Sequence, residues 1–130
     1  MTPLDDALVE DDIATITRLL DADPELVNRA NAKGQTLIDL AVSRSSVEVV
    51  ELLIRRGAII NKREHVYGAF PLLQAVARKR REVVEVLLRH GADPTMADKE
   101  WGTAHDLAVA LDQPDITEVL RRYAKEQGHR

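Results

Sequence analysis

The histidines and paired aspartates are the residues of this chain that could support acid–base or metal chemistry. The four histidines are widely spaced: His65, His90, His105 and His129. No pair of them has the i, i+4 spacing with a glutamate that a zinc-binding helix needs. The pairs Asp5-Asp6 and Asp11-Asp12 lack the ligand spacing of a calcium loop, and helix-start acids favoured by the helix dipole explain them better.

Nucleotide and thiol chemistry have no support in the sequence. Neither G-x-G-x-x-G nor G-x-x-x-x-G-K-[ST] is present, so no glycine-rich loop is available to bind phosphate. The chain has no cysteine, which excludes disulfides, thiolate metal sites and a cysteine nucleophile. We therefore expect a protein that is not an enzyme, with no catalytic residues, no metal and no cofactor.

The densest group of positive charge is the run Arg78-Lys79-Arg80-Arg81. Three interpretations are open: a solvated turn between helices, a contact site for an acidic protein, or a nucleic-acid patch. The overall charge of −4 disfavours the third, and we expect no nucleic-acid partner. Residues 1–30 carry eight acids against two bases, for a net charge of −6, whereas residues 62–95 carry seven bases against four acids, for +3.

Composition predicts a single soluble domain. Of its 130 residues, 45% are apolar and 31% charged, while aromatic residues make up only 3%, so the core must be aliphatic. The segment Met1–Asp6 has no basic or apolar region typical of a signal peptide. No apolar run approaches the ~20 residues that a membrane span needs. We expect a cytoplasmic, monomeric protein without membrane contact.

The sequence repeats itself with a period of about 33 residues, and the repeated elements would position any site. Gly57-Ala58 recurs as Gly91-Ala92, and Ala41 recurs as Ala75 and then as Ala108. Such self-similarity is typical of a repeat array, in which each unit buries its apolar side against its neighbours.

The repeated segments resemble the ankyrin-repeat family. Residues 2–7, 34–41, 68–75 and 103–108 are similar to its G-x-T-P-L-H-x-A signature, and residues 47–53 and 81–88 resemble its second helix. The resemblance implies an all-α solenoid of four helix-turn-helix units with β-hairpin fingers. We expect one domain, 1–130, with repeats at about 1–30, 31–61, 62–95 and 96–130, the first without a finger.

The residues also predict local structure. First helices are expected at about 3–9, 37–44, 71–78 and 104–111, and second helices at about 12–21, 46–56, 80–90 and 113–125. Thr36 and Thr103 are suited to N-cap a helix. The turn between the helices, where the family has glycine, carries four other residues, each of which would be left-handed: Asp11, Ser45, Lys79 and Asp112. In the fourth unit either Trp101 or Gly102 takes the turn-glycine position.

The resemblance places binding on a concave face made of finger tips and the exposed ends of the first helices. Mapped residue by residue, the expected partner-binding positions are Lys33, Gln35, Arg44, Arg63, His65, Tyr67, Arg78, Lys99, Trp101 and Leu111. Aromatic and arginine side chains are enriched at binding hot spots, so this face would suit an acidic protein surface. Trp101 could equally pack against the neighbouring finger and stiffen it.

Two functions from different classes follow. The first is a protein–protein interaction module, possible forms of which include an inhibitor or immunity-type protein that masks an enzyme. The alternative is a self-associating scaffold, in which the acidic first unit of one molecule meets the basic middle of another. Attraction between surface charges weakens with salt, so the association state at low and high salt separates the two.

Overall fold

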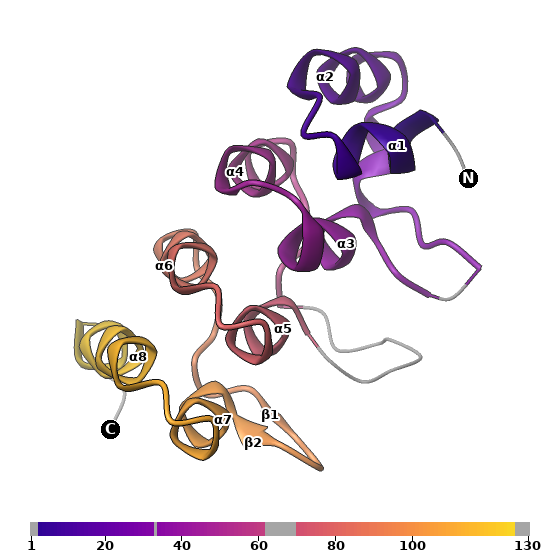
Figure 1. Cartoon of the computed structure of the whole chain (residues 1–130). Helices are drawn as coiled ribbons and strands as arrows, with labels where there is room; N and C mark the ends of the chain where they lie inside the picture. The colour runs from indigo at the N-terminus through magenta and orange to yellow at the C-terminus, as the bar shows by residue number, and fades with distance from the viewer. Residues whose placement is uncertain (1–2, 33, 62–69, 127–130) are drawn as a thin grey trace.

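The computed structural model describes residues 3–32, 34–61 and 70–126, and these residues form a stack of four helix pairs (Figure 1). In chain order the α-helices are α1 (Pro3–Val9), α2 (Ile13–Ala22), α3 (Leu37–Arg44), α4 (Val47–Arg55), α5 (Pro71–Ala77), α6 (Arg81–Arg89), α7 (Ala104–Ala110) and α8 (Pro114–Glu126). A 3-10 helix, η1 (Pro24–Asn28), follows α2, and the short strands β1 (Ala97–Asp98) and β2 (Gly102–Thr103) precede α7. We call the successive helix pairs repeats 1 to 4.

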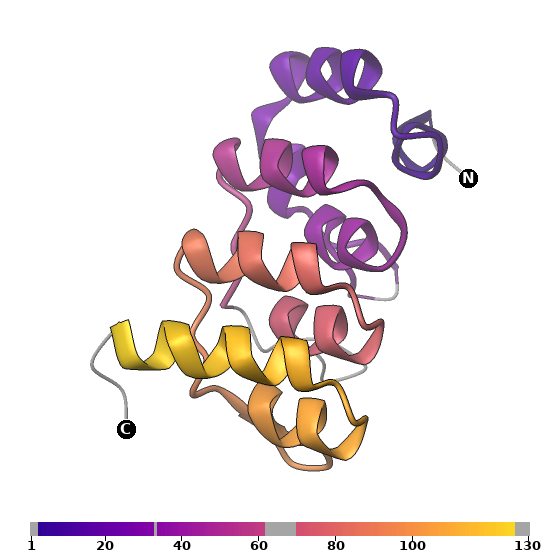
Figure 2. The ribbon, with the colours of Figure 1, turned by 60° about the vertical axis from the view of Figure 1, so that its left-hand side comes forward.

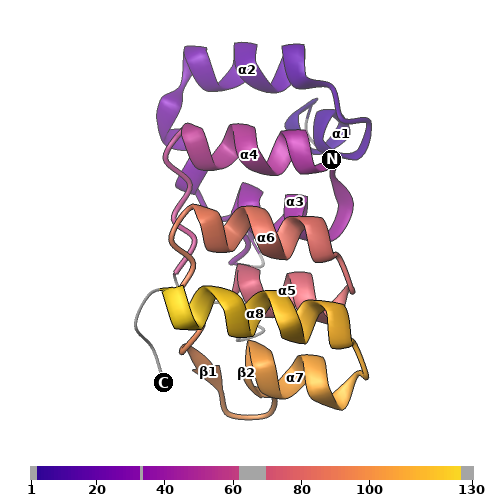
Figure 3. The same cartoon turned by 90° about the vertical axis from the view of Figure 1, so that its left-hand side faces the viewer.

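The helices form two layers. The inner helices α1, α3, α5 and α7 follow one another along one side of the stack, and the outer helices α2, α4, α6 and α8 lie antiparallel to them on the other (Figures 1 and 2). Helix α3 packs on α5 and α5 on α7, while α4 packs on α6 and α6 on α8. Figure 3 shows the outer helices as a ladder of nearly parallel rungs. The predicted all-α solenoid is confirmed.

The helix ends follow the residue types that begin and end helices. Pro71 and Pro114 are the first residues of α5 and α8, where the missing N–H is not needed. Gly57 and Gly91 follow α4 and α6 with φ of +94° and +98°, a conformation that glycine adopts without steric cost. Helix α8 has 13 residues against nine in α4 and α6, and no glycine stands at the corresponding point to end it.

Both threonines stand at the N-cap positions predicted for them. Thr36 precedes α3, and its backbone N–H donates to Asp39 Oδ2 at 2.9 Å. Thr103 precedes α7, and there the exchange is reciprocal: Thr103 N donates to Asp106 Oδ2 at 3.0 Å, and Asp106 N donates to Thr103 Oγ1 at 3.2 Å. The bond from Thr103 N is the main reason that the pKa of the Asp106 carboxyl is lowered from its ordinary value.

The four turns between paired helices are not alike. Asp11, Lys79 and Asp112 have φ of 56°, 58° and 55°, so the left-handed conformation expected of them is confirmed. The same expectation is wrong for Ser45, whose φ is −99°. Ser45 is buried, and its hydroxyl donates to the carbonyl of Leu8 in repeat 1 at 2.8 Å. An extended Ser45 thus satisfies a carbonyl of the preceding repeat.

Replacing Lys79 by glycine is expected to raise the free energy of unfolding by about 1 kcal/mol, because a left-handed conformation costs a β-carbon-bearing residue about 1–2 kcal/mol and glycine nothing. Asp11→Gly is the matched control. Asp11 Oδ1 accepts a hydrogen bond from Ser46 N at 2.6 Å, which the glycine would lose. Urea titrations should therefore show a gain for Lys79→Gly only; a loss there would contradict the strain argument.

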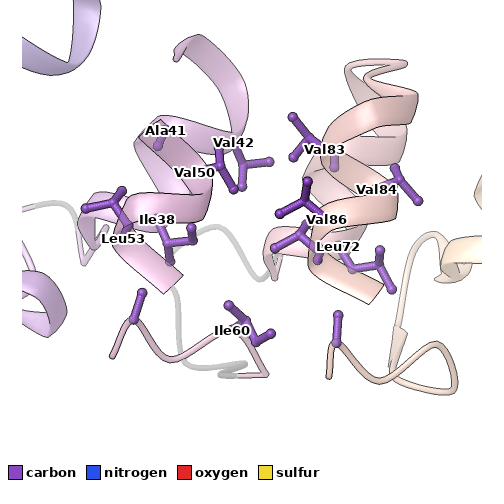
Figure 4. Packing of buried hydrophobic residues seen from close by; sticks show 14 of the residues in the cluster. Ile38, Ala41, Val42, Val50, Leu53, Ile60, Leu72, Val83, Val84 and Val86 are labelled. Carbon is purple, nitrogen blue, oxygen red and sulfur yellow. The ribbon is translucent and has the colours of Figure 1, made fainter. Parts of the chain in front are cut away.

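The core is aliphatic except for Phe70, which is 2% exposed, and it is continuous through the stack. Figure 4 shows Val42 of repeat 2 directed at Val83 of repeat 3, and both side chains have no solvent exposure. Val76, which is equivalent to Val42, is also fully buried. Val109 occupies the same position in repeat 4 and is 58% exposed, because no repeat follows it in the described structure.

Two asparagines connect neighbouring repeats beyond the C-terminal ends of the outer helices. Asn28 donates through Nδ2 to the Gly57 carbonyl at 2.9 Å and accepts from Ile59 N at 2.9 Å. Asn61 makes the same pair of bonds to Gly91 O and Asp93 N, at 3.0 and 2.9 Å. Each asparagine therefore holds one repeat to the next through a donated and an accepted hydrogen bond.

Candidate functional site

The inner helices and the fingers together form one face of the molecule, which we call the groove face. Among the described residues it carries two hollows. The basic hollow, of about 320 Å³, lies between repeats 2 and 3 and is lined by Gln35, Asp39, Leu40, Ser43, Arg44, Gln74, Ala77 and Arg78. The apolar hollow, of about 240 Å³, lies between repeats 3 and 4 and is lined by Leu73, Gln74, Ala77, Trp101, Leu107 and Leu111. Because Gln74 and Ala77 line both, the two hollows are contiguous.

The fourth finger positions Trp101 at the apolar hollow. Strands β1 and β2 pair antiparallel, with Asp98 opposite Gly102, and Asp98 Oδ1 accepts bonds from Glu100 N at 2.7 Å and Trp101 N at 3.3 Å. Gly102 has φ of +76°, and a β-carbon there would collide with the carboxylate of Asp106. Gly102 therefore takes the turn-glycine position, and Trp101 remains 53% exposed at the edge of the hollow.

The basic hollow presents two arginines from equivalent helix ends. Arg44 is the last residue of α3, and Arg78 caps the C-terminus of α5; both side chains are exposed. No ion pair or hydrogen bond joins either guanidinium to another residue within the described ranges. Beside them the Ser43 hydroxyl donates to Gln74 Oε1 at 3.3 Å, which joins α3 to α5 across the wall of the hollow.

Two further arginines of the Arg78–Arg81 run make contacts within the molecule. Arg80 is half-buried and donates to three backbone carbonyls at the end of α3: Ala41 at 3.3 Å, Val42 at 2.8 Å and Ser45 at 2.5 Å. Arg81 Nε pairs with Glu85 Oε1 at 3.3 Å on α6. The interpretation of the run as a purely solvated turn is therefore wrong for Arg80, which links repeat 3 to repeat 2.

The structure brings together five of the ten predicted binding residues: Gln35, Arg44, Arg78, Trp101 and Leu111 line one or other hollow. Lys99 is exposed in the turn between β1 and β2 but lines neither. Four predicted positions lie outside the described residues: Lys33, Arg63, His65 and Tyr67. They stay predictions.

The ten predicted positions do not include four residues that line the apolar hollow, namely Leu73, Gln74, Ala77 and Leu107. Gln74 and Leu107 are spaced by one repeat, and both belong to the first-helix signature. Gln74 was detectable in the sequence, because it is the one polar side chain within the apolar segment Pro71–Ala77.

The groove face presents two arginines, a glutamine and an apolar hollow bordered by Trp101. In the part of the chain that the structure describes, no three His, Asp or Glu side chains gather as a metal site. Among the described residues, the carboxyls of Asp106 and Asp12 have lowered pKa values because they accept hydrogen bonds at helix starts. The pKa of Asp12 is lowered chiefly by the hydroxyl of Thr15, which donates to it at 2.6 Å. None of the helices within the described ranges has the length and hydropathy to span a bilayer.

Comparison with known proteins agrees with this geometry. The family model for ankyrin repeats (3 copies) matches residues 4–98, so the chain belongs to the ankyrin-repeat family. The fourth helix pair, α7 and α8, lies beyond the matched residues but continues the same stack. Ankyrin repeats are general protein–protein interaction modules, and the family is non-catalytic.

Two curated relatives are similar to most of the chain. The ankyrin repeat and SAM domain-containing protein 6 of Rattus norvegicus is 36% identical over 109 residues, and the protein of the same name from Mus musculus is 35% identical over the same length. Each alignment covers 84% of this chain and 12% of the relative. The chain therefore spans about an eighth of the length of these relatives.

Proposed function

We propose that this chain binds a partner protein through the groove face, and that the partner presents an acidic surface there. One observation carries the proposal: two exposed arginines without an ion pair in the described structure stand beside a hollow that ends at a half-exposed tryptophan. Arginine and tryptophan are among the residues most enriched at binding hot spots. If the partner is an enzyme whose active site is covered, the chain acts as an inhibitor or immunity-type protein.

The surface charges argue against the self-associating alternative. Two acids of the first unit are engaged within the molecule, since Asp21 pairs with Arg56 at 2.5 Å and Asp23 pairs with Arg29 at 3.0 Å. On the basic side, Arg80 is bound to backbone carbonyls. These side chains are held within one molecule and are less available for contacts between two copies, so a monomer that binds a different protein is the function we propose.

The test is affinity capture with a variant that removes the groove-face anchors. Arg44→Ala, Arg78→Ala and Trp101→Ala together are expected to abolish capture of the partner and to change the midpoint of thermal unfolding little, since all three side chains are exposed.

The matched control carries Arg55→Ala, Arg121→Ala and Val109→Ala, which remove two arginines and one exposed apolar side chain away from the two hollows. It should keep the partner. A partner retained by the groove-face variant would place the interaction elsewhere.

A further inference from the structure

The inner helices present one row of equivalent side chains along the groove face. The row contains the residue at or just after the end of each inner helix: Glu10, Arg44, Arg78 and Leu111. From repeat 1 to repeat 4 it therefore changes from acidic through two basic positions to apolar. A ligand that lies along the row meets a different chemistry at each repeat, so the face has a direction.

The two hollows show the same change along the groove face, from basic between repeats 2 and 3 to apolar between repeats 3 and 4. The apolar hollow is closed by Leu73 and Leu107, which are 2% and 3% exposed, and is bordered by Leu111 and Trp101. The basic hollow, one repeat away, carries Arg44 and Arg78. Each hollow lies between two adjacent inner helices, so their centres are one repeat step apart.

The repeat step sets the spacing of side chains in a ligand that fills both hollows. Packed helices lie about 8–10 Å apart. A polyproline II segment turns once in three residues and rises about 3.1 Å per residue, so every third side chain points the same way at about 9 Å. In a β-strand, side chains on one face recur at about 7 Å and about 13 Å, which do not match one helix spacing.

From these observations, and resting on the proposed function, we propose that the groove face binds an extended peptide segment of its partner that carries a bulky apolar residue and an acidic residue three positions apart. The apolar side chain fills the hollow between repeats 3 and 4, beside Trp101. The carboxylate lies between Arg44 and Arg78. Glu10, at the next position of the row, repels a further acid, so the acidic part of the segment ends within repeat 2.

The test uses a phage-displayed library of random twelve-residue peptides selected on the intact chain. We expect enriched peptides to share an apolar residue and an Asp or Glu at a separation of three. A synthetic copy should shift the fluorescence of Trp101, the only tryptophan, to shorter wavelength, because an apolar side chain replaces water at its exposed ring.

Three changes to that peptide or to the protein are expected to lower the affinity about tenfold, the scale of removing one charged group from a recognition site. They are Glu→Gln in the peptide, displacement of its acid by one position, and Arg78→Ala in the protein. Arg55→Ala, which removes an arginine from the outer helix α4, should change the affinity less than twofold.

Several outcomes would overturn the inference: no enriched peptide, enriched peptides without acids, or equal affinity at separations of two, three and four. Such a result combined with loss of the captured partner by the groove-face variant would leave the proposed function intact. Retention of the partner by that variant would instead remove the proposed function.

Discussion

Leu87→Ala is expected to lower the free energy of unfolding by about 2–5 kcal/mol. Leu87 belongs to α6, has no solvent exposure, and lies in repeat 3 with packed helices on both sides of it. Truncation removes buried methyl groups and leaves a cavity, which surrounding side chains fill only in part. Urea unfolding followed by two probes measures the change and tests whether the transition remains two-state.

The control for this prediction is a substitution at the end of the array, where fewer contacts surround the side chain than at Leu87. In a repeat array each unit contacts only its neighbours, so a cavity in repeat 3 weakens contacts to repeats 2 and 4. Val109→Ala, at a 58% exposed position on the end of repeat 4, should change the stability by less than about 0.5 kcal/mol. A loss below about 1 kcal/mol for Leu87→Ala would mean that the interface between repeats collapses around the cavity.

The stack and its caps could be predicted because they depend on local, repeated signals. A period near 33 residues fixes the number of helix pairs, prolines and glycines fix most helix ends, and Thr36 and Thr103 have the hydroxyls that caps require. Ser45 was mispredicted because its conformation depends on a contact with Leu8 in another repeat.

The site could be predicted in part for a similar reason. Arg44, Arg78 and Leu111 follow from counting to the ends of equivalent helices, and the structure places them at the two hollows. The apolar hollow itself was not predicted, because Leu73 and Leu107 have the residue type of core positions. Whether such a leucine also borders a surface hollow depends on the size of the side chains around it.

The sequence did not predict the contacts that Arg80 makes. Its replacement by alanine is the second change for which we expect a large loss of stability. We expect Arg80→Ala to lower the free energy of unfolding by about 2 kcal/mol, since hydrogen bonds from a charged donor contribute about 1.5–3 kcal/mol. The side chain donates to the carbonyls of Ala41, Val42 and Ser45, which stand at the negative end of the α3 dipole. Urea titration measures the loss.

Arg81→Ala is the matched control, because it removes the same charge from the next residue. Its pair with Glu85 is an exposed i, i+4 contact, which contributes only about 0.3–0.5 kcal/mol. Arg80→Lys should be intermediate, since an ammonium keeps the charge but cannot reach three acceptors as a planar guanidinium does. Equally small losses in the free energy of unfolding for Arg80→Ala and Arg81→Ala would show instead that both arginines belong to a solvated turn.

A second measurement locates the effect of Arg80. The amides of Ser45 and Ser46 donate to Ala41 O at 2.8 Å and Asp11 Oδ1 at 2.6 Å, so both report on the end of α3. In Arg80→Ala these amides should exchange with solvent faster, while amides of α8 should not. Arg78→Ala, two residues away, should leave exchange unchanged and affect only ligand binding. Two arginines of one run would then be separated experimentally, one as a link between repeats and one as a contact for the partner.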